Sequence, residues 1–537
     1  MSVSTLAGIE NTGIENAGIQ NTAVTASPDQ RTRQHRWLLK RLAEVLAPAE
    51  ISVTGADLES SATDRSGHRL AGHPLAVLRP NSIESVQAIL RIASATRVVV
   101  VPRGAGTGLS GGAAVPDGAL VLSTENLTDI VRMDPDNEIA VVQAGVVTAD
   151  LDAAAAEHGL MYAPDPASHE ISTIGGNIAT NAGGLHCVKY GVTQESVLGL
   201  TVVLADGSVL RTGKQTIKGV VGYDLTALLV GSEGTLGVVV EATVRLRPRP
   251  VKTRTAVAFF PSAAAAAAGV GALIRARVQP SVLELLDAGS LQAIDRAQGT
   301  VLSKGTVLAK GTVLANRAGL GDGGLPSTRA LLLAQTDGYG ADAEIEVLGA
   351  ALAAAGGQVE FLEDEAAAHY LWLRRHGRGP APDVWMIGED VAVPRSALPA
   401  MLTAINAIGT RYGLDVSVVA HAGDGNLHQL FSIAKRPDDQ GVPPAVLAVA
   451  ADELVRAAIA CGGTISGEHG VGITKREWLE LEISPDALSL QRRVKAAFDP
   501  HGILNPHTWL SEVTAAGPAT TTLSPDGVVR PYGDERS

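Results

Sequence analysis

Arg97-Val-Val-Val-Val-Pro-Arg103-Gly-Ala-Gly-Thr-Gly-Leu-Ser-Gly-Gly112 decides the fold, because it joins four consecutive valines to a loop with five glycines. An unbroken run of β-branched residues predicts a strand that is buried on both faces. Glycines after such a strand let backbone N–H groups approach an anion closely, so the loop predicts an anion-binding concavity. The spacing Gly104-Ala-Gly-Thr-Gly differs from Gly-x-Gly-x-x-Gly, and a plain turn is the alternative.

Two further loops have the same character. Ser172-Thr-Ile-Gly-Gly-Asn-Ile-Ala-Thr-Asn-Ala-Gly-Gly184 is uncharged and crowded with hydroxyls, amides and glycines, and Gly231-Ser-Glu-Gly-Thr-Leu-Gly237 follows later. Backbone and amide groups in such loops hydrogen-bond a polar heterocycle or a pyrophosphate. Three of these loops in one α/β region exceed what turns require, so they predict a ligand as long as a dinucleotide.

The chain divides at Pro248-Arg-Pro250. Before this point, from about residue 74, short Val- and Leu-rich strands are combined with a helix over 82–93 and with Asp-Gly turns. After it, Ala-rich helices alternate with Val-rich strands, as in layered α+β domains. We therefore expect an α+β protein with a first domain over 29–250, whose core is 72–250, and a second domain over 251–510.

Other segments are expected to add little to these two cores. Residues 1–28 repeat a pentapeptide and are interpreted as a flexible leader, and residues 511–537 as a flexible tail. A hexapeptide tandem beginning at Gly299 marks 298–325 as a surface insertion. The amphipathic pattern over 30–46 predicts a helix packed on the first domain, with contact to a membrane surface or a partner as alternatives.

Charge and composition restrict the functional classes. The net charge of −13 argues against a nucleic-acid-binding protein, which would present a basic face. The two cysteines, Cys187 and Cys461, are too few for a disulfide framework or a Cys-x-x-Cys metal site. Residues 255–274 lack charges, but Pro261 and many small side chains favour a strand and a helix over a membrane span. We therefore expect a cytoplasmic protein without a membrane span.

His421-Ala-Gly-Asp-Gly-Asn-Leu-His428 predicts a metal site. Asp424-Gly425 favours a two-residue hairpin turn, which would place His421 opposite His428 with Cβ atoms roughly 5 Å apart. Ser466-Gly-Glu-His-Gly470 adds a carboxylate, Glu468, and a third imidazole. Two imidazoles and one carboxylate with open positions are typical of a catalytic metal, and zinc and manganese both fit. A solvated hairpin with two incidental histidines is the alternative.

Several motifs together resemble the FAD-binding (PCMH-type) domain of the vanillyl-alcohol-oxidase-type flavoproteins. They are residues 103–112, 175–184, 189–191, 222–224 and 231–237. With 421–428, 466–472 and 499–506, the chain resembles the branch that oxidises D-2-hydroxy acids, namely the glycolate oxidase D subunit, D-lactate dehydrogenases and D-2-hydroxyglutarate dehydrogenases. The resemblance covers about residues 70–510 and implies a two-part FAD-binding domain followed by an α+β substrate or cap domain.

The same resemblance implies how FAD is held, without a covalent bond. The residues that would cradle the pyrophosphate are Arg103, Gly104, Ala105, Gly106, Thr107, Gly108 and Leu109. Those that would line the flavin are Pro164, Thr173, Gly176, Asn177, Thr180 and Gly183. Gly234 to Val238 would lie on the adenine side, and Asn505 would close on the cofactor from the far domain.

For the reaction, the resemblance implies oxidation of a small D-2-hydroxy acid, of the glycolate or D-lactate type, with the hydride passing to N5 of FAD. Trp372-Leu-Arg-Arg375 matches the family's Trp-x-x-Arg, which puts Arg375 on the substrate carboxylate, with Arg374 and Arg378 as alternatives.

The metal would lower the pKa of the substrate hydroxyl. His469 would act as the general base, and Asn426 would support the metal ligands.

Other functions remain open at this point. They are an ether-lipid-forming synthase on the same fold, a non-catalytic FAD subunit of an oxidase complex, and a metal-storing or structural protein. Glu468 favours the hydroxy-acid reaction. The electron acceptor is open among oxygen, a quinone, an electron-transfer flavoprotein and an iron–sulfur protein. Because the chain has only two cysteines, an iron–sulfur relay would have to lie on a partner protein.

Overall fold

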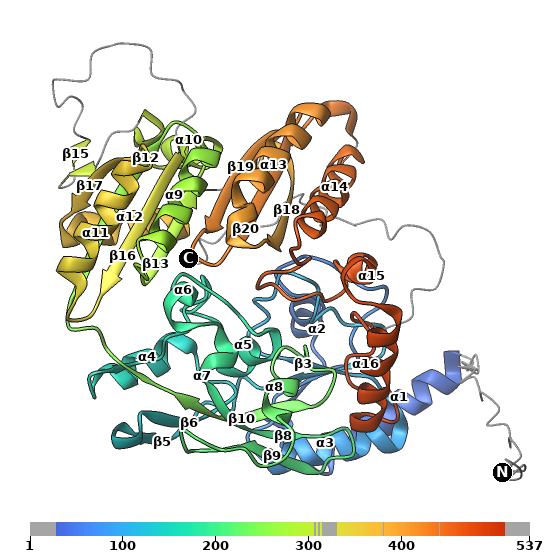
Figure 1. Ribbon diagram of the computed structural model, residues 1–537. Helices are drawn as coiled ribbons and strands as arrows, with labels where there is room; N and C mark the ends of the chain where they lie inside the picture. The colour runs from blue at the N-terminus through green and yellow to red at the C-terminus, as the bar shows by residue number, and fades with distance from the viewer. Residues whose placement is uncertain are drawn as a thin grey trace, which may run out of the picture.

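A computed structural model describes residues 28–304, 308–309, 312–313, 330–379, 381–439 and 441–510. The expected leader and tail and most of the expected insertion therefore lie outside the described residues. In Figure 1 the first part of the chain, blue to green, forms a lower domain, and the yellow and orange part forms an upper one. The mixed helix and strand content confirms the α+β class.

The valine run forms the end strand of a small sheet in the first domain. The strand order is β1 (Ile51–Ser52), β2 (Ala76–Leu78), β4 (Leu120–Ser123) and β3 (Val100–Arg103), in which β2, β4 and β3 are parallel. Val100 packs against α1 (Pro28–Ala43) and α3 (Ile83–Thr96), whereas Val101 faces the side of α2 (Gly55–Ser61). The prediction of a strand buried on both faces is confirmed.

A five-stranded antiparallel sheet forms the second part of this domain. Its order is β5 (Ile130–Asp134), β6 (Ile139–Gln143), β10 (Val238–Arg245), β8 (Val197–Val203) and β9 (Val209–Gly213). The accompanying elements are α4 (Thr148–Ala156), α5 (Ile174–Thr180), α6 (Cys187–Tyr190), α7 (Thr193–Ser196), α8 (Leu225–Leu229) and the strand pair β7 (Leu160–Met161) and β11 (Arg247–Pro248). Helices α4 and α5 share a core with this sheet, so the glycine loop before α5 is held against it.

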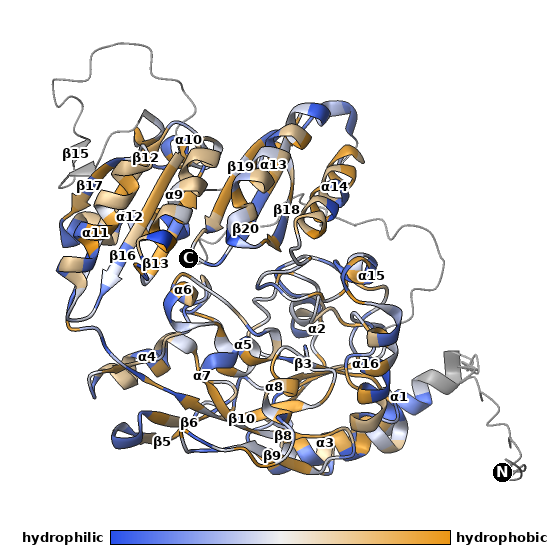
Figure 2. Cartoon of the chain, viewed as in Figure 1, coloured by the Kyte–Doolittle hydropathy of each residue, from blue (hydrophilic) through white to orange (hydrophobic). Residues whose placement is uncertain are grey.

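The second domain is built on a seven-stranded antiparallel sheet. Its order is β17 (Gln358–Leu362), β12 (Thr253–Phe260), β16 (Ala330–Asp337), β13 (Val282–Leu286), β19 (Asp415–His421), β20 (Asn426–Ala434) and β18 (Val384–Ala392). One face carries α9 (Ala263–Arg275), α11 (Ala341–Ala354), α13 (Leu398–Tyr412) and α14 (Val446–Ala460). Figure 2 shows hydrophobic residues along β12, β16 and β19 and along the helices that cover them.

Only part of the other face of this sheet is covered. Helices α10 (Ala288–Gln298) and α12 (Asp364–His376) pack there against Leu286, Leu331 and Val419. The polar side chains of Glu284 on β13, His421 on β19 and Asp390 on β18 are buried. The free part of this face is where the polar residues of the site collect.

Short elements complete the described chain. They are β14 (Leu308–Ala309), β15 (Thr312–Val313), α15 (Leu479–Glu482), α16 (Pro485–Phe498) and 3₁₀ turns at Pro48–Glu50, Pro135–Asn137, Leu302–Lys304, Arg395–Ala397, Pro437–Asp439 and Arg476–Trp478.

The last described residues of the expected 251–510 domain pack on the first domain. Ile503 and Leu504 are buried in the core that contains α1 and α3, and Leu504 forms a parallel bridge with Val100. Figure 1 shows α16, in red, beside the first domain. Hydrophobic burial of two residues adjacent to β3 explains a placement that chain order alone cannot predict.

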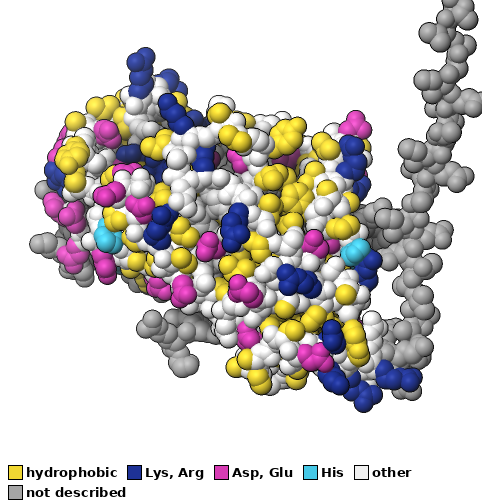
Figure 3. Space-filling view, turned by 90° about the horizontal axis from the view of Figure 1, so that it is seen from below, with side chains coloured by type: hydrophobic (Ala, Val, Ile, Leu, Met, Phe, Trp, Pro, Cys, Tyr) yellow, Lys and Arg dark blue, Asp and Glu magenta, His cyan; other side chains and the backbone are white. Residues whose placement is uncertain are grey.

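The amphipathic pattern over 30–46 corresponds to α1 and the turn after it. Leu38, Leu42 and Leu46 are buried in the first domain, so the expected packing of this helix is confirmed. Among the helices of the described residues, none combines the length and the apolar character that a bilayer crossing requires. On the face seen from below, Lys and Arg side chains are interspersed with Asp and Glu over most of the view, and several Lys and Arg lie together at its lower right (Figure 3).

Candidate active site

A cavity of about 380 Å³ lies between the two domains. The first domain contributes the predicted residues Arg103, Gly104, Ala105, Gly106, Thr107, Gly108, Leu109, Thr173, Gly176, Asn177, Thr180, Gly183, Gly234 and Val238. The second contributes Arg374, Arg375, Arg378, His421, His428, Glu468 and His469. Residues predicted from separate motifs for a cofactor, a metal and a substrate therefore share one cavity.

The first glycine loop borders the cavity and has unpaired backbone N–H groups. Among the described residues, none accepts a hydrogen bond from a backbone N–H of residues 104–109. A Cβ at Gly104 would lie 2.5 Å from Oγ1 of Thr173, so only glycine fits where this loop meets the start of α5. The Arg103 guanidinium turns back and donates to the Thr63 carbonyl at 2.7 Å, which stabilises the loop itself. Free N–H groups around a narrow glycine-lined space fit a pyrophosphate.

The second loop leads into α5 and supplies polar groups. Oγ1 of Thr173 accepts from the Gly176 N–H at 3.3 Å, and this cap begins the helix. The buried Asn177 amide donates to Oγ1 of Thr148 at 2.6 Å, so its position is set by the neighbouring helix. These contacts hold the loop backbone open toward the cavity.

Glu233, in the third loop, joins the two domains. It has φ of 51°, and its carboxylate accepts the backbone N–H groups of Val471 and Gly472, each at 2.8 Å. Burial raises the pKa of Glu233 to about 7, although the hydrogen bonds from these two N–H groups lower it. This contact fixes the loop that carries Glu468 and His469 against the first domain.

Pro164 and Asn505, which were both predicted to contact the cofactor, do not line the cavity. The Asn505 amide is buried and donates to the carbonyls of Gly112 and Glu233, at 2.8 and 2.9 Å. It therefore connects two glycine loops from behind and does not close on the cavity. Pro164 is buried, and Pro166 lies on the cavity in its place.

The predicted hairpin register is wrong, although the predicted proximity of the two imidazoles is correct. His421 pairs with Asn426 and Val419 with His428. A type I′ turn needs positive φ at both central residues, and here Gly425, with φ of 91°, meets this condition but Asp424 does not. The N–H groups of Asp424 and Gly425 both donate to the His421 carbonyl, which makes a four-residue loop. The rings lie diagonally on one face, with centroids 5.1 Å apart.

His421, His428 and Glu468 form a cluster that fits a divalent cation. Their ligand atoms lie within 4.8 Å of one another, and both Nε2 atoms approach Oε1 of Glu468, at 3.4 Å from His421 and 3.1 Å from His428. Burial alone would raise the pKa of Glu468, but the His421 and His428 imidazoles hold it well below its usual range. Two imidazole nitrogens around one ionised carboxylate are the donor set of an open metal site.

Glu284 supports this cluster and was not predicted. Its carboxylate accepts from Nδ1 of His421 at 2.7 Å and from Nε of Arg374 at 2.6 Å, and the side chain is fully buried. The hydrogen bond at Nδ1 leaves Nε2 of His421 to face Glu468, as in the carboxylate–histidine pairs of metal sites. The sequence carried a signal, because Glu284 is the one charged residue in the apolar strand β13.

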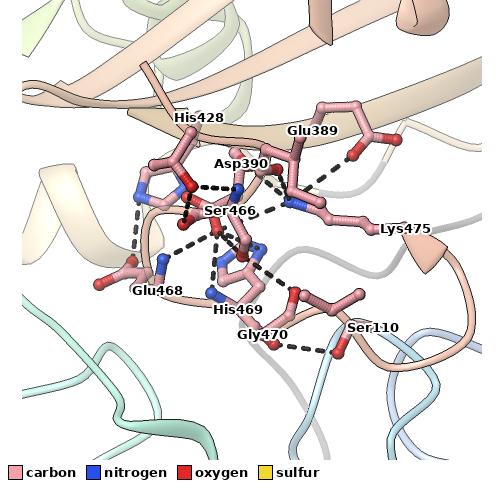
Figure 4. Close-up of polar contacts among 12 residues, drawn as sticks. Ser110, Glu389, Asp390, His428, Ser466, Glu468, His469, Gly470 and Lys475 are labelled. Atoms are coloured by element: carbon pink, nitrogen blue, oxygen red, sulfur yellow. Dashed lines mark hydrogen bonds and ion pairs between the residues drawn. The ribbon is translucent and has the colours of Figure 1, made fainter. Parts of the chain in front are cut away.

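Asp390 positions the loop of His469 and was also not predicted. Oδ2 of Asp390 accepts from Oγ of Ser466 at 3.0 Å and from the N–H groups of Glu468 and His469 at 2.9 and 2.8 Å (Figure 4). Burial would raise the pKa of Asp390, but His469 and Lys475 hold it well below its usual range. A single carboxylate thus fixes the backbone on either side of Glu468.

His469 lies between the metal cluster and the first glycine loop. Its ring stacks on His428 with centroids 5.2 Å apart, and its carbonyl accepts from Oγ of Ser110 at 3.0 Å (Figure 4). Burial lowers the pKa of His469 to about 4. The imidazole is therefore neutral at neutral pH and can accept a proton.

The predicted substrate arginine already has partners. Arg375 forms an ion pair with Asp165 and contacts Nδ1 of His169 at 3.1 Å. Asp165 also contacts Nδ1 of His186 at 3.1 Å. Neither His186 nor Cys187 is among the residues that line the cavity.

Comparisons with known proteins define the family. Residues 74–213 match an FAD binding domain, and residues 249–508 match the C-terminal domain of FAD linked oxidases. The chain is 41% identical to "Glycolate oxidase subunit GlcD" of Bacillus subtilis, over 81% of this chain and 88% of that protein. It is 34% identical to a D-lactate dehydrogenase of Archaeoglobus fulgidus, over 81% and 91%, and to a D-2-hydroxyglutarate dehydrogenase of Stutzerimonas stutzeri, over 87% and 98%.

Solved structures agree on the fold. p-Cresol methylhydroxylase superposes with a TM-score of 0.70 at 17% identity, covering 89% of this chain and 97% of the other. An alkyldihydroxyacetonephosphate synthase gives 0.66 at 16% identity, covering 88% and 85%. These likenesses concern the fold alone. The chain belongs to the FAD-linked oxidase family of PCMH-type flavoproteins, as its motifs predicted, and is an FAD-dependent oxidoreductase.

Proposed function

We propose that this oxidoreductase converts a small D-2-hydroxy acid to the 2-oxo acid, and that it acts on the hydroxyl-bearing carbon and adjacent carboxylate that glycolate and D-lactate share. The observation that carries the proposal is that His421, His428 and Glu468 meet beside His469 on the wall of the glycine-lined cavity. The relatives named glycolate oxidase subunit and D-lactate dehydrogenase support it.

The three glycine loops would hold FAD without a covalent bond, with Arg103 to Leu109 at the pyrophosphate. FAD, when bound, supplies the two-electron acceptor, with N5 as the atom that takes the hydride from the substrate carbon. The buried Asn505 would keep the loops of Gly112 and Glu233 in place without touching the cofactor. The substrate loses one hydride and one proton in all, which balances its conversion to the 2-oxo acid.

His421, His428 and Glu468 would hold a divalent ion, zinc or manganese, which supplies a Lewis acid that lowers the pKa of the substrate hydroxyl. His421 is kept in position by Glu284, which in turn is held by Arg374. Asn426 lies next to the ligands, and its buried Oδ1 has no hydrogen-bond partner among the described residues.

His469 takes the hydroxyl proton in this proposal. Its pKa of about 4 means that the imidazole is unprotonated at neutral pH before the reaction begins. Asp390 and Ser110 fix its backbone, so the ring is held beside His428.

Arg375 would bind the substrate carboxylate with the N–H groups that Asp165 and His169 leave free, since a guanidinium has five donors. Asp165 would hold the guanidinium in place. The electrons would pass from the flavin to an iron–sulfur or electron-transfer partner protein. Two relatives are named as subunits of glycolate oxidase, which supports the existence of such a partner. A cytoplasmic location stays a prediction from the sequence.

Anaerobic flavin reduction tests the proposal directly. FAD-loaded protein is mixed with glycolate, D-lactate or L-lactate in the absence of oxygen, and bleaching of the visible flavin band is followed in time. We expect rapid bleaching by a D-2-hydroxy acid or glycolate and little by the L isomer. A bound flavin that no 2-hydroxy acid reduces would falsify the proposed function.

The metal role has its own test. A chelator that removes all bound zinc and manganese is expected to slow flavin reduction strongly, and readdition of either ion to restore it. Full activity in protein shown by elemental analysis to be free of metal would remove the metal from the mechanism and leave the flavin chemistry standing.

A further inference from the structure

Three arginines, Arg374, Arg375 and Arg378, lie on the cavity at the end of α12 and just beyond it. Carboxylates neutralise two of them, because Glu284 pairs with Arg374 and Asp165 with Arg375. For Arg378 the described hydrogen bond is a long one, 3.5 Å from Nη1 to the Ser417 hydroxyl. No ion pair joins Arg378 to a carboxylate of the described residues. A desolvated cation of this kind is costly without an anion beside it.

The groups around Arg378 supply that anion only from a distance. Its acidic neighbour, Asp287, attracts the guanidinium without forming an ion pair with it, and this carboxylate is the N-cap of α10 and accepts the Ser290 N–H at 2.8 Å. Its other charged neighbour, Arg374, has the same sign, and burial lowers the pKa of Arg378 to about 10. Nη2 of Arg374 is also buried without a hydrogen-bond partner. This part of the cavity wall is therefore rich in unmatched N–H donors.

We propose that Arg378 binds a second anionic group of the substrate, so that the preferred substrate is a 2-hydroxy dicarboxylic acid rather than a monocarboxylic one. The inference rests on the proposed function, because it takes the reacting end of the acid to lie at His421, His428 and Glu468. It adds a specificity-determining residue that lies outside the Trp372-x-x-Arg375 motif.

The contacts of the two arginines set the length of the substrate. Arg374 marks the reacting end of the site, because it shares Glu284 with His421. Arg378 lies beyond the end of α12, and its Nη1 reaches Ser417 on β19, four residues before His421, which is about 13 Å along a strand that rises about 3.3 Å per residue. A two- or three-carbon acid held at the metal cluster ends before this point, whereas a longer acid with a second carboxylate extends toward it. The planar guanidinium can then bind that carboxylate through two parallel hydrogen bonds.

Two measurements on FAD-loaded protein test the inference. Without turnover, glutarate and butanoate are titrated against the oxidised flavin, and the change in its spectrum gives each Kd. With turnover, anaerobic reduction rates are compared for D-2-hydroxyglutarate, D-malate and D-lactate. The variants are Arg378→Met, Arg378→Lys and, as a matched control, Arg296→Met, which changes an exposed arginine on α10.

We expect glutarate to bind more tightly than butanoate and the dicarboxylic hydroxy acids to reduce the flavin more efficiently than D-lactate. Arg378→Met should lower the preference for D-2-hydroxyglutarate over D-lactate about ten- to hundred-fold, as expected for a lost charged hydrogen bond. Arg378→Lys should recover part of the preference, and Arg296→Met should keep all of it.

The outcomes separate this inference from the proposed function. If the unchanged protein binds glutarate no better than butanoate, or if Arg378→Met leaves the substrate preference as it was, the inference is wrong and the proposed function stands. The comparison of glutarate with butanoate uses the unchanged protein, so it tests the inference even if Arg378→Met fails to fold. Failure of every 2-hydroxy acid to reduce the bound flavin removes the proposed function and the inference together.

Discussion

Glu284→Gln is the substitution that best tests how the metal cluster is built. The carboxylate is fully buried between Nε of Arg374, at 2.6 Å, and Nδ1 of His421, at 2.7 Å. Glutamine keeps the shape but removes the negative charge, which leaves the Arg374 cation buried without a counterion. Removing one partner of a buried ion pair costs about 3–5 kcal/mol, and we expect the lower end because the amide oxygen still accepts one hydrogen bond.

The same substitution should weaken metal binding. Glu284 holds His421 with Nε2 toward Glu468, and loss of such a supporting carboxylate lowers metal affinity about 10- to 100-fold. Stability is measured as the free energy of unfolding in urea, and zinc affinity by competition with a chelating dye. Flavin content should be retained, because Glu284 does not line the cavity.

Glu453→Gln is the matched control. Glu453 pairs with Arg411 at the surface, where the two side chains are 31% and 57% exposed, so its loss should cost about 0–1 kcal/mol and leave zinc affinity unchanged. If Glu284→Gln loses no more stability than Glu453→Gln and binds zinc with unaltered affinity, the described role of Glu284 is refuted.

Three further predictions concern the base, the cofactor loop and pH. His469→Ala should slow anaerobic flavin reduction about 10²- to 10⁴-fold with flavin still bound, and a normal reduction rate would exclude His469 as the base. Gly104→Ala should lose bound FAD on gel filtration, because its Cβ would lie 2.5 Å from Oγ1 of Thr173, and full flavin retention would contradict this. Burial raises the pKa of Glu233 from the usual 4.5 to about 7, so the folded state binds this proton more tightly than the unfolded state. Protonated Glu233 should therefore stabilise the folded state fully below pH 4.5, and this stabilisation of up to about 3 kcal/mol should be lost as the pH rises through 7. The free energy of unfolding of Glu233→Gln, measured in urea, should not show this pH dependence.

Local chemistry explains how much of the site could be predicted. The glycine loops and the two histidines are recognisable because each depends on residues close together in sequence, whose conformational needs are local. The hairpin register was wrong for a related reason. Gly425 satisfies positive φ, but Asp424 does not adopt it, and the Val393 N–H bonds the Gly425 carbonyl from a separate segment.

Long-range packing explains what could not be predicted. Glu284 and His421 are 137 positions apart, and Arg375 and Asp165 are 210 apart, so no periodicity links them. Asn505 was expected to close on the cofactor, but Ile503 and Leu504 are buried in the first domain and place it behind the loops.

The sequence by itself determined the kinds of group that this protein brings to its cavity, namely glycine loops with free N–H groups, imidazoles and a carboxylate. These follow from residue types and turn chemistry within a few positions. Only the tertiary structure decided which charges neutralise one another. It pairs Glu284 with Arg374 and Asp165 with Arg375, and leaves Arg378 without an ion pair among the described residues. The physical reason is that ion pairing depends on distance in space, which sheet order and domain packing set.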